Sequence, residues 1–392
     1  MPWQEESTMQ LRRQFIQDVH SGASPITELC RAYGISRKTG YKCLDRYEAG
    51  GLPGLADRSR RPQHSPTATP PELVRALLEA RHHHPTWGPR KLLRLLRQEL
   101  PHAPWPARST IALHLHRAGL VVTPRRVRRP GHPGRPQAPM DAPNAIWTAD
   151  FKGQFKLGDG QYCYPLTLAD GYSRLLLRCQ ALTSTQVLES RPVFQRAFEE
   201  YGLPARIRSD NGVPFATQAL GRLSPLSVWW LRLGILPDLT EPASPQQNGR
   251  HERMHRTLKA ECIRPPKATR RAQQRRFDTW RTEYNELRPH EALHDATPAS
   301  CYTPSPRPYP RRLPPLEYPG HYEVRRVSHN GGIRWYCEWV NVSQTLGGEY
   351  IGLVEIDHRE WDVYFGPLRL GRFHEDTLRI EDAWGRQHRR PY

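Results

Sequence analysis

The chain has 392 residues, 37% of them hydrophobic, and carries a formal net charge of +19. This length predicts several domains, while the absence of a long apolar run or a signal-peptide segment excludes a membrane partner and leaves a cytoplasmic protein. Residues 1–140 hold 23 Lys and Arg against 10 Asp and Glu, an excess that predicts binding to nucleic acid. Seven cysteines, none at CxxC spacing, indicate neither a zinc site nor a disulfide framework.

A first helical domain is predicted near the N-terminus. Residues 26–48, ITELCRAYGISRKTGYKCLDRYE, divide at Gly34, and Ser36 can cap the helix that follows. Basic and polar residues crowd the start of that helix, as in a helix-turn-helix whose second helix enters the major groove; an ordinary antiparallel helix pair is the alternative. We assign a DNA-binding domain to residues 1–56, with candidate DNA contacts at Arg37, Lys38, Thr39, Tyr41 and Lys42.

A basic linker over residues 57–70 leads to a second helix-turn-helix domain over residues 71–122, in which Arg90 and Lys91 are candidate DNA contacts. Residues 123–143 contain too much Pro and Arg to pack a core. We interpret them as a basic linker that follows phosphates through Arg125, Arg126, Arg128 and Arg129.

The composition changes at residue 144. NAIWTADFKGQF alternates as a strand does, with Ile146, Thr148 and Asp150 on one face. The segment 161–182 predicts a hairpin that turns at Asp170–Gly171, and a helix and a short strand follow within residues 185–212. Strands followed by helices predict an α/β layered core over residues 144–302.

The C-terminal part begins with a Pro-rich linker over residues 303–320. Residues 321–392 then hold short alternating runs, among them IRWYCEWVNV and YIGLVEID. This spacing of short strands predicts a small all-β barrel.

Three carboxylates stand in an order that suits phosphoryl transfer: Asp150 on the first strand, Asp210 at the end of a later strand and Glu252 in a following helix. Mg²⁺ binds through a few carboxylates, and two such ions roughly 3.5–4 Å apart can activate an attacking oxygen and stabilise a leaving one. Asp238 and Glu241 are rival third carboxylates. For Glu252, inside the basic run SPQQNGRHERMHRTLKAE, the alternative is a solvated helix with one ion pair.

Five motifs occur in the order WTADFKG, LADGYSR, RSDNG, SPQQNGRHERMHRTLK and YNELRPHEALHDATPASCY. With them, residues 10–302 resemble the DDE-type insertion-sequence transposases that have a retroviral-integrase-like core. The resemblance implies a multidomain chain with all-α helix-turn-helix modules and an α/β ribonuclease H-like catalytic core. The C-terminal β-barrel is predicted from strand spacing alone. It also implies that Asp150, Asp210 and Glu252 are the catalytic, metal-binding triad, and that Asp170 is a structural hairpin residue. The 41 residues between Asp210 and Glu252 exceed the family's usual spacing, and we expect the extra length around residues 216–228.

The activity implied by this resemblance has three steps: binding the terminal inverted repeats of an insertion sequence, cleaving the DNA ends by metal-dependent hydrolysis, and joining the 3′ ends to target DNA. The implied cofactor is Mg²⁺ (or Mn²⁺), two ions per site, and the implied partners are double-stranded DNA and further copies of the chain, at the nucleoid of a bacterial cytoplasm. Two alternatives stay open: a non-catalytic DNA-binding regulator, and a ribonuclease H-like nuclease that cuts without joining.

Around Glu252, candidate DNA-backbone contacts are Asn248, Arg256 and Lys259. At about 100° per residue, positions 252, 256 and 259 share one helix face, whereas positions 254, 258 and 262 should pack on the core. The basic neighbours of Glu252 are therefore expected to hold the DNA backbone.

Overall fold

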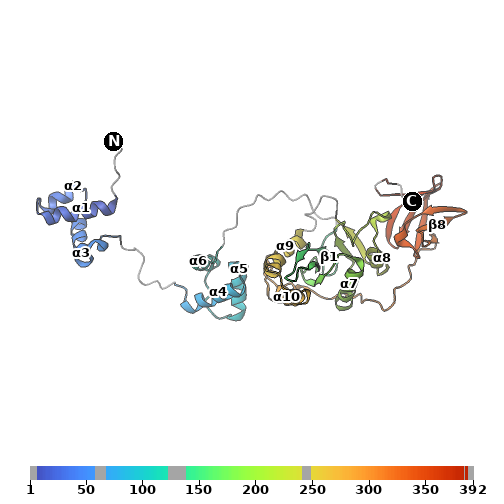
Figure 1. Ribbon diagram of the computed structural model, residues 1–392, viewed down its shortest axis with the longest axis horizontal. Coiled ribbons are helices and arrows are strands. Elements are labelled where there is room, and N and C mark those ends of the chain that lie inside the picture. Colours follow the sequence, from blue (N-terminus) through green and yellow to red (C-terminus); the bar gives the residue numbers. More distant parts are fainter. Residues whose placement is uncertain (1–6, 58–67, 122–137, 241–248, 384, 387–392) are drawn as a thin grey trace. The chain divides into compact units, whose positions relative to one another are not determined.

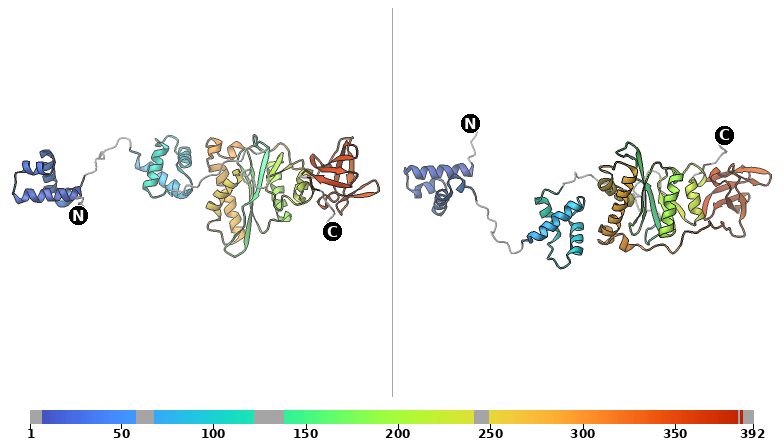
Figure 2. Two further views of the ribbon diagram at one scale, coloured as in Figure 1. Left: turned by 90° about the horizontal axis from the view of Figure 1, so that it is seen from above. Right: turned by 60° about the horizontal axis from the view of Figure 1, so that its bottom comes forward.

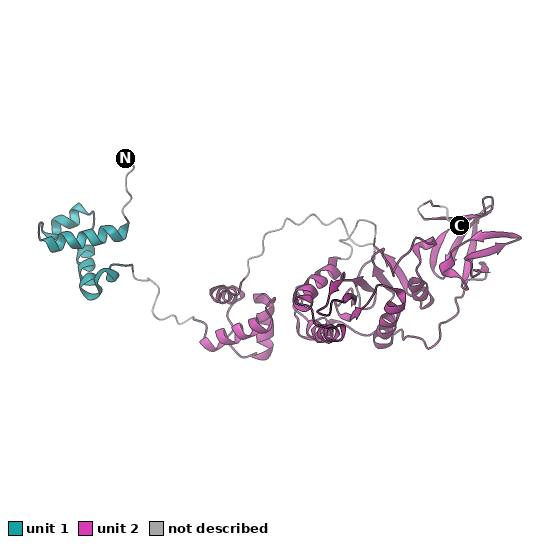
Figure 3. Cartoon of the chain, in the orientation of Figure 1, with its two compact units in different colours: residues 1–68 teal, residues 69–392 magenta. Residues whose placement is uncertain are grey.

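A computed structural model describes residues 7–57, 68–121, 138–240, 249–383, 385 and 386. The chain divides into two compact units, Met1–Ala68 and Thr69–Tyr392 (Figure 3). Among the described residues, no helix combines the length and apolar character that crossing a bilayer requires.

The first unit is a three-helix domain made of α1 (Thr8–Ser21), α2 (Ile26–Ala32) and α3 (Arg37–Gly54) (Figure 1). Ser36 caps α3 as predicted, because its hydroxyl accepts a hydrogen bond from the Thr39 backbone N–H at 3.2 Å. Gly40 lies where α2 and α3 approach closely, and a Cβ at this position would stand 2.5 Å from Cys30 Sγ. The predicted helix-turn-helix arrangement is confirmed.

The second unit begins with another helical module, α4 (Pro71–His83), α5 (Pro89–Glu99) and α6 (Arg108–Arg117). These helices pack around buried Trp87, Leu92, Ile111 and Leu115. The four arginines predicted to follow phosphates in the next linker, at positions 125, 126, 128 and 129, lie outside the described residues.

The catalytic-core region contains one mixed sheet. Its strands are β1 (Ile146–Phe151), β2 (Phe155–Lys156), β3 (Tyr162–Asp170), β4 (Leu176–Leu182), β5 (Arg206–Ser209) and β6 (Leu236–Leu239). The order is β2-β3-β1-β5-β6, with β4 also pairing with β3. Strand β1 runs antiparallel to β3 and parallel to β5, so the carboxyl ends of β1 and β5 meet at one edge.

Helices cover both faces of this sheet (Figure 2). Helices α7 (Val187–Tyr201) and α8 (Pro225–Arg232) pack on the face that includes Trp147 and Ala149 of β1. Helices α9 (Gly249–Leu258) and α10 (Arg270–Thr282) cover the other face, toward which the alternating residues Thr148 and Asp150 point. Short π and 3-10 turns follow these helices at Lys259–Ile263, Glu283–Leu287, Glu291–Leu293 and Ala299–Cys301. The core is therefore the three-layered α/β, ribonuclease H-like structure that was expected.

The predicted C-terminal barrel is wrong, although the all-β class is right. Strands β7 (Glu323–Arg326), β10 (Tyr350–Asp357), β11 (Glu360–Phe365), β12 (Leu368–His374) and β13 (Arg379–Asp382) form an antiparallel sheet in the order β13-β12-β11-β10-β7. Strands β8 (Gly332–Trp335) and β9 (Glu338–Asn341) form a separate pair, and a 3-10 turn follows at Gln344–Leu346. Since β7 and β13 do not pair with each other, the sheet stays open within the described residues.

The long segment between β5 and α9 has a structural role. It contains the 3-10 turn Leu220–Arg222 and helix α8, whose Val228 and Leu231 lie in the same buried cluster as Ile351 and Phe373 of the C-terminal sheet. Leu220 and Leu223 join this cluster. Residues 220–231 therefore help attach the C-terminal domain to the core.

Candidate active site

The three predicted carboxylates lie at the shared edge of β1, β5 and α9. Thr148 pairs with Arg208 across the parallel strands, so Asp150 and Asp210, each two residues farther on, come to the same level of the sheet. Glu252 lies in the first turn of α9, on the face of the sheet toward which Asp150 points. Asp210 and Glu252 are exposed, whereas the Asp150 side chain is 19% exposed.

The three carboxylates interact through their charges. Burial, together with the negative charges of Asp210 and Glu252, raises the pKa of Asp150 to about 7. Burial also raises the pKa of Asp210, although the Gly212 backbone N–H stabilises its charged form. A cluster of this kind favours binding of protons or cations, because either one relieves the repulsion between the carboxylates.

Asp150 is supported by a buried chain of hydrogen bonds that the sequence analysis missed. His251 lies between two hydroxyls: its Nδ1 is 2.7 Å from Thr148 Oγ1 and its Nε2 is 2.6 Å from Thr167 Oγ1. The same Thr167 oxygen is 2.7 Å from His255 Nε2, and His255 Nδ1 is 3.5 Å from Asp150 Oδ2. The chain thus runs from Thr148 through both imidazoles to the carboxylate.

Both histidines are uncharged in this environment. Burial lowers the pKa of His251 to about 3 and also lowers the pKa of His255, which the neighbouring His251 lowers further. The expectation that the basic neighbours of Glu252 contact DNA is therefore wrong for these two residues. Their spacing carried the missed signal: His251 and His255 lie one helical turn apart on the face that buries Met254 and Leu258.

The directions of these hydrogen bonds depend on the histidine tautomers. If the Thr167 hydroxyl donates to the Asp150 carbonyl oxygen, 3.0 Å away, both imidazoles donate from Nε2 and the Nδ1 lone pair of neutral His255 faces the Asp150 carboxylate. If it donates to His255 Nε2 instead, His255 Nδ1–H points at that carboxylate. In the first arrangement, a proton or a cation near this pair satisfies both groups.

Within the described residues, one set of donor atoms at this site converges closely enough to hold a metal ion. Ligand atoms of Asp150, His251 and His255 lie within 4.8 Å of one another, but both His251 nitrogens and His255 Nε2 already bond to hydroxyls. Carboxylate oxygens are the ligands that Mg²⁺ and Mn²⁺ prefer. By ligand chemistry the carboxylates of Asp150, Asp210 and Glu252 suit these ions better than the imidazoles do, but in this structure their oxygen atoms do not all lie within 4.8 Å of one another.

The rival acids have other roles or lie outside the described residues. Asp238 pairs with Arg208 at 2.6 Å, and Glu241 is not among the described residues. Asp170 is buried and accepts hydrogen bonds from the Asn144 backbone N–H at 2.8 Å and from the Ser173 backbone N–H and hydroxyl at 2.7 Å each. These bonds fix the hairpin turn, which agrees with the structural role expected for Asp170.

The predicted DNA contacts differ in their surroundings. All those at the start of α3 are exposed, namely Arg37, Lys38, Thr39, Tyr41 and Lys42. Arg256 and Lys259 are also exposed, although the helix changes to a π-turn at Lys259; Asn248 is outside the described residues. Arg90 forms ion pairs with Glu291 and Asp295, each at 2.8 Å, so any contact of Arg90 with DNA competes with these two acids.

Comparison with known families agrees with this architecture. Residues 140–245 match the integrase core domain, and residues 233–298 match a second family of the same description. Residues 11–63 match a helix-turn-helix domain and residues 39–115 a homeodomain-like domain.

Similar proteins occur in bacterial insertion elements and in retroviruses. The uncharacterized 31.7 kDa protein of insertion element IS407 from Burkholderia multivorans is 29% identical over 58% of this chain and 79% of its own length. The uncharacterized 39.2 kDa protein of insertion element IS476 from Xanthomonas euvesicatoria is 26% identical over 75% of this chain and 78% of its own length. The Gag-Pol polyprotein of koala retrovirus is 27% identical over 50% of this chain and 11% of that polyprotein.

Among solved structures, the catalytic core domain of HTLV-2 integrase in complex with magnesium aligns at 17% identity with a TM-score of 0.31, covering 41% of this chain and 98% of that domain. At this score the alignment adds nothing to the fold described above. The sequence matches along the core and the N-terminal helices carry the assignment. The chain resembles the insertion-sequence transposases with a retroviral-integrase-like core.

Proposed function

We propose that this transposase binds the terminal inverted repeats of its insertion sequence, cleaves the DNA ends by metal-dependent hydrolysis and joins the freed 3′ ends to target DNA. One observation carries the proposal: Asp150 lies close enough to Asp210 and Glu252 that their charges, added to the larger effect of burial, raise its pKa. Charge repulsion of this kind is found in folded proteins most often at functional sites, such as cation-binding sites.

The three carboxylates would hold the divalent ions, Mg²⁺ or Mn²⁺, two per site. Bound there, such ions supply activation of the attacking oxygen and stabilisation of the leaving oxygen. Asp150 is the most constrained ligand, since His255 and the Thr167 hydroxyl fix its surroundings. Asp210 and Glu252, being exposed, would meet the DNA strand directly.

The helix-turn-helix domains would supply end recognition. The exposed basic start of α3, with Arg37 and Lys38, is placed as in domains that read the major groove. Because an element has two ends and each chain carries one carboxylate cluster, a complete reaction requires at least two copies of the chain. The complex would act at the nucleoid of the bacterial cytoplasm, where its DNA lies.

Sequencing of reaction products tests this function. The purified protein is incubated with a duplex that carries the inverted repeats flanking its gene, with a target plasmid, and with either Mg²⁺ or EDTA. The proposal predicts Mg²⁺-dependent junctions between the 3′ ends of the repeats and the target. Cleavage without junctions would indicate a nuclease, and binding without cleavage would indicate a regulator.

A further inference from the structure

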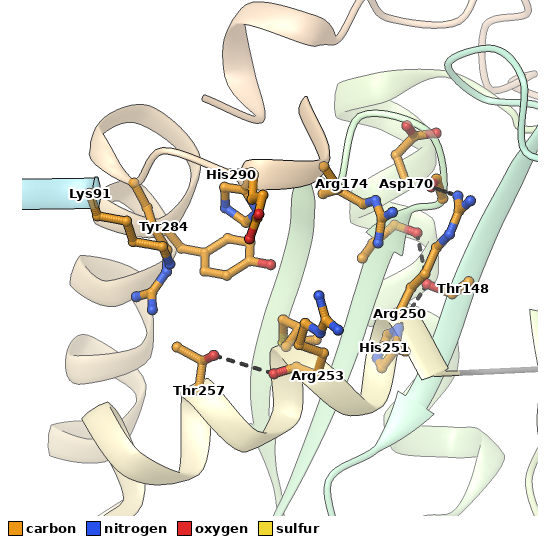
Figure 4. Close-up of a pocket in the computed structure, with 16 residues that line it drawn as sticks. Lys91, Thr148, Asp170, Arg174, Arg250, His251, Arg253, Thr257, Tyr284 and His290 are labelled. Carbon is orange, nitrogen blue, oxygen red and sulfur yellow. Dashed lines mark hydrogen bonds between the residues drawn. The ribbon is translucent and has the colours of Figure 1, made fainter. Parts of the chain in front are cut away.

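A second site lies beside α9, on the side of the helix away from Glu252. It is a pocket of about 170 Å³ into which cationic side chains converge from four segments (Figure 4). These are Lys91 of α5, Arg174 of the β3–β4 turn, Arg250 and Arg253 of α9, and Arg288 after α10. His290 also lines the pocket but is uncharged, because burial lowers its pKa to about 3. A single water needs only about 10–15 Å³ in this measure, so the pocket has room for a polyatomic ion.

Several of these cations have unused hydrogen-bonding capacity. Arg288 is engaged, since it donates to both carboxylate oxygens of Glu261 at 2.9 Å, and Arg250 donates to the Gly171 carbonyl at 2.7 Å. In contrast, Arg174 Nε is buried without a partner, and the side chains of Lys91 and Arg253 have no hydrogen-bond or ion-pair partner within the part of the chain that the structure describes.

The acids that line the pocket do not balance this charge. Glu291 is paired with Arg90 at 2.8 Å, and Asp170 is occupied by its backbone and hydroxyl donors in the hairpin turn. The remaining excess of positive charge is partly desolvated. Burial and the neighbouring guanidinium groups lower the pKa of Lys91 to about 8 and that of Arg174 to about 10.

The composition of the pocket indicates the class of ligand. Guanidinium groups match the oxygen geometry of phosphate and carboxylate, while Ala169, Met254 and the ring of Tyr284 limit the space between them. The position indicates phosphate. Thr148 and His251 line the pocket and belong to the hydrogen-bonded chain that reaches Asp150. An α-helix is about 10–12 Å across with its side chains, so the pocket lies within a few nucleotides of Glu252 along a DNA strand.

We propose that this pocket binds one phosphate group of the DNA substrate, a few nucleotides from the bond that is cleaved. The inference rests on the proposed function in that DNA is the ligand. Helix α9 would then contact the strand on two sides, through Glu252 at the metal site and through Arg253 at the pocket. Occupation of the pocket would fix α9, and with it the histidines that support Asp150.

The double variant Arg174→Gln/Arg253→Gln tests the site, because it removes two charges and keeps both side chains polar. Arg271→Gln on the exposed surface of α10 is the matched control. Dissociation constants for an inverted-repeat duplex are measured across a NaCl series. Two lost phosphate contacts are expected to reduce the salt slope by up to about 2 and to weaken binding about tenfold or more, while the control matches the wild type.

Two further arms identify the phosphate. Duplexes with a 5′-phosphate or a 5′-hydroxyl at the cleaved end distinguish a terminal phosphate from a bridging one: only a terminal site would make wild-type affinity depend on that group. Inorganic phosphate should raise the melting temperature of the wild type and of Arg271→Gln, but not of the double variant. This arm also reports folding, because a misfolded double variant would lack the wild-type melting transition without phosphate.

The outcomes separate this inference from the proposed function. If the double variant keeps the wild-type salt slope, affinity and phosphate response, the pocket is not a phosphate site. If wild-type protein neither cleaves nor joins with Mg²⁺ but its phosphate response depends on Arg174 and Arg253, the pocket stands and the proposed reaction fails.

Discussion

Between pH 5 and pH 8, the metal-free wild type should lose more unfolding free energy than the variant Asp150→Asn. The substitution removes a partly buried negative charge and keeps the size of the side chain. Asp150 has a pKa of about 7 in the folded protein against an ordinary value of 3.8. The folded state therefore binds this proton more tightly than the unfolded chain does. The resulting stabilisation is complete below pH 3.8 and is lost as the pH rises through 7.

The size of the effect follows from the two pKa values. Their difference corresponds to about 4 kcal/mol when the proton is fully lost. At pH 5 about 1–2 kcal/mol of this has already been lost, so about 2–3 kcal/mol remains to be lost between pH 5 and pH 8. The Asp150 side chain is only 19% exposed, so solvent screening reduces this figure modestly.

Urea unfolding in EDTA at pH 5 and pH 8 measures the difference, with tryptophan fluorescence, to which the buried core residues Trp147 and Trp230 contribute, as the signal. Between these pH values the wild type should lose about 2–3 kcal/mol more unfolding free energy than Asp150→Asn. Comparing the change with pH cancels any pH-independent effect of the substitution. Parallel pH dependences would refute the raised pKa of Asp150 in the folded protein. Addition of Mg²⁺ at pH 8 should stabilise the wild type but not the variant.

Three further predictions concern other parts of the chain. Thr167→Val leaves two buried imidazole nitrogens without a hydrogen-bond partner, so unfolding free energy should fall by about 2–4 kcal/mol and the cleavage rate should fall at unchanged DNA affinity. Thr167→Ser should restore both, and a normal rate in the Val variant would show that the hydrogen-bonded chain is dispensable. Gly40→Ala places a Cβ against Cys30 Sγ, so the unfolding free energy of the first domain should fall by about 1–3 kcal/mol. The DNase footprint of this domain on the inverted repeats should disappear, whereas an unchanged melting curve would contradict the close packing. Lys259→Ala should slow joining and lower the salt slope by about 1 if Lys259 contacts a phosphate; wild-type values for both would eliminate it as a contact.

The sequence predicted the positions of the main elements because their patterns are local. Alternation in IWTADF predicted β1 and the common face of Thr148 and Asp150, and Ser36 predicted the start of α3 through its capping chemistry. The acids were found by their order along the chain and by the motifs around them. These signals do not depend on distant contacts.

The misses depended on tertiary structure. His251 and His255 looked like part of a basic surface, but Thr148 and Thr167 on the neighbouring strands supply the hydroxyls that let neutral imidazoles be buried. Closure of the C-terminal barrel could not be predicted from strand spacing, because it depends on whether the edge strands β7 and β13 meet. The cationic pocket likewise gathers residues as far apart as Lys91 and Arg288, which no short motif connects.

The most direct test of the proposed carboxylate triad is DNA joining by Glu252→Gln, which removes one ligand charge from an exposed side chain and leaves the fold intact. Glu286→Gln, at another exposed glutamate, is the matched control. In Mg²⁺, Glu252→Gln should bind the inverted repeats with wild-type affinity and lose cleavage and joining by orders of magnitude, while Glu286→Gln retains both. Near-normal joining by Glu252→Gln would contradict the assignment of the three carboxylates as the catalytic metal site.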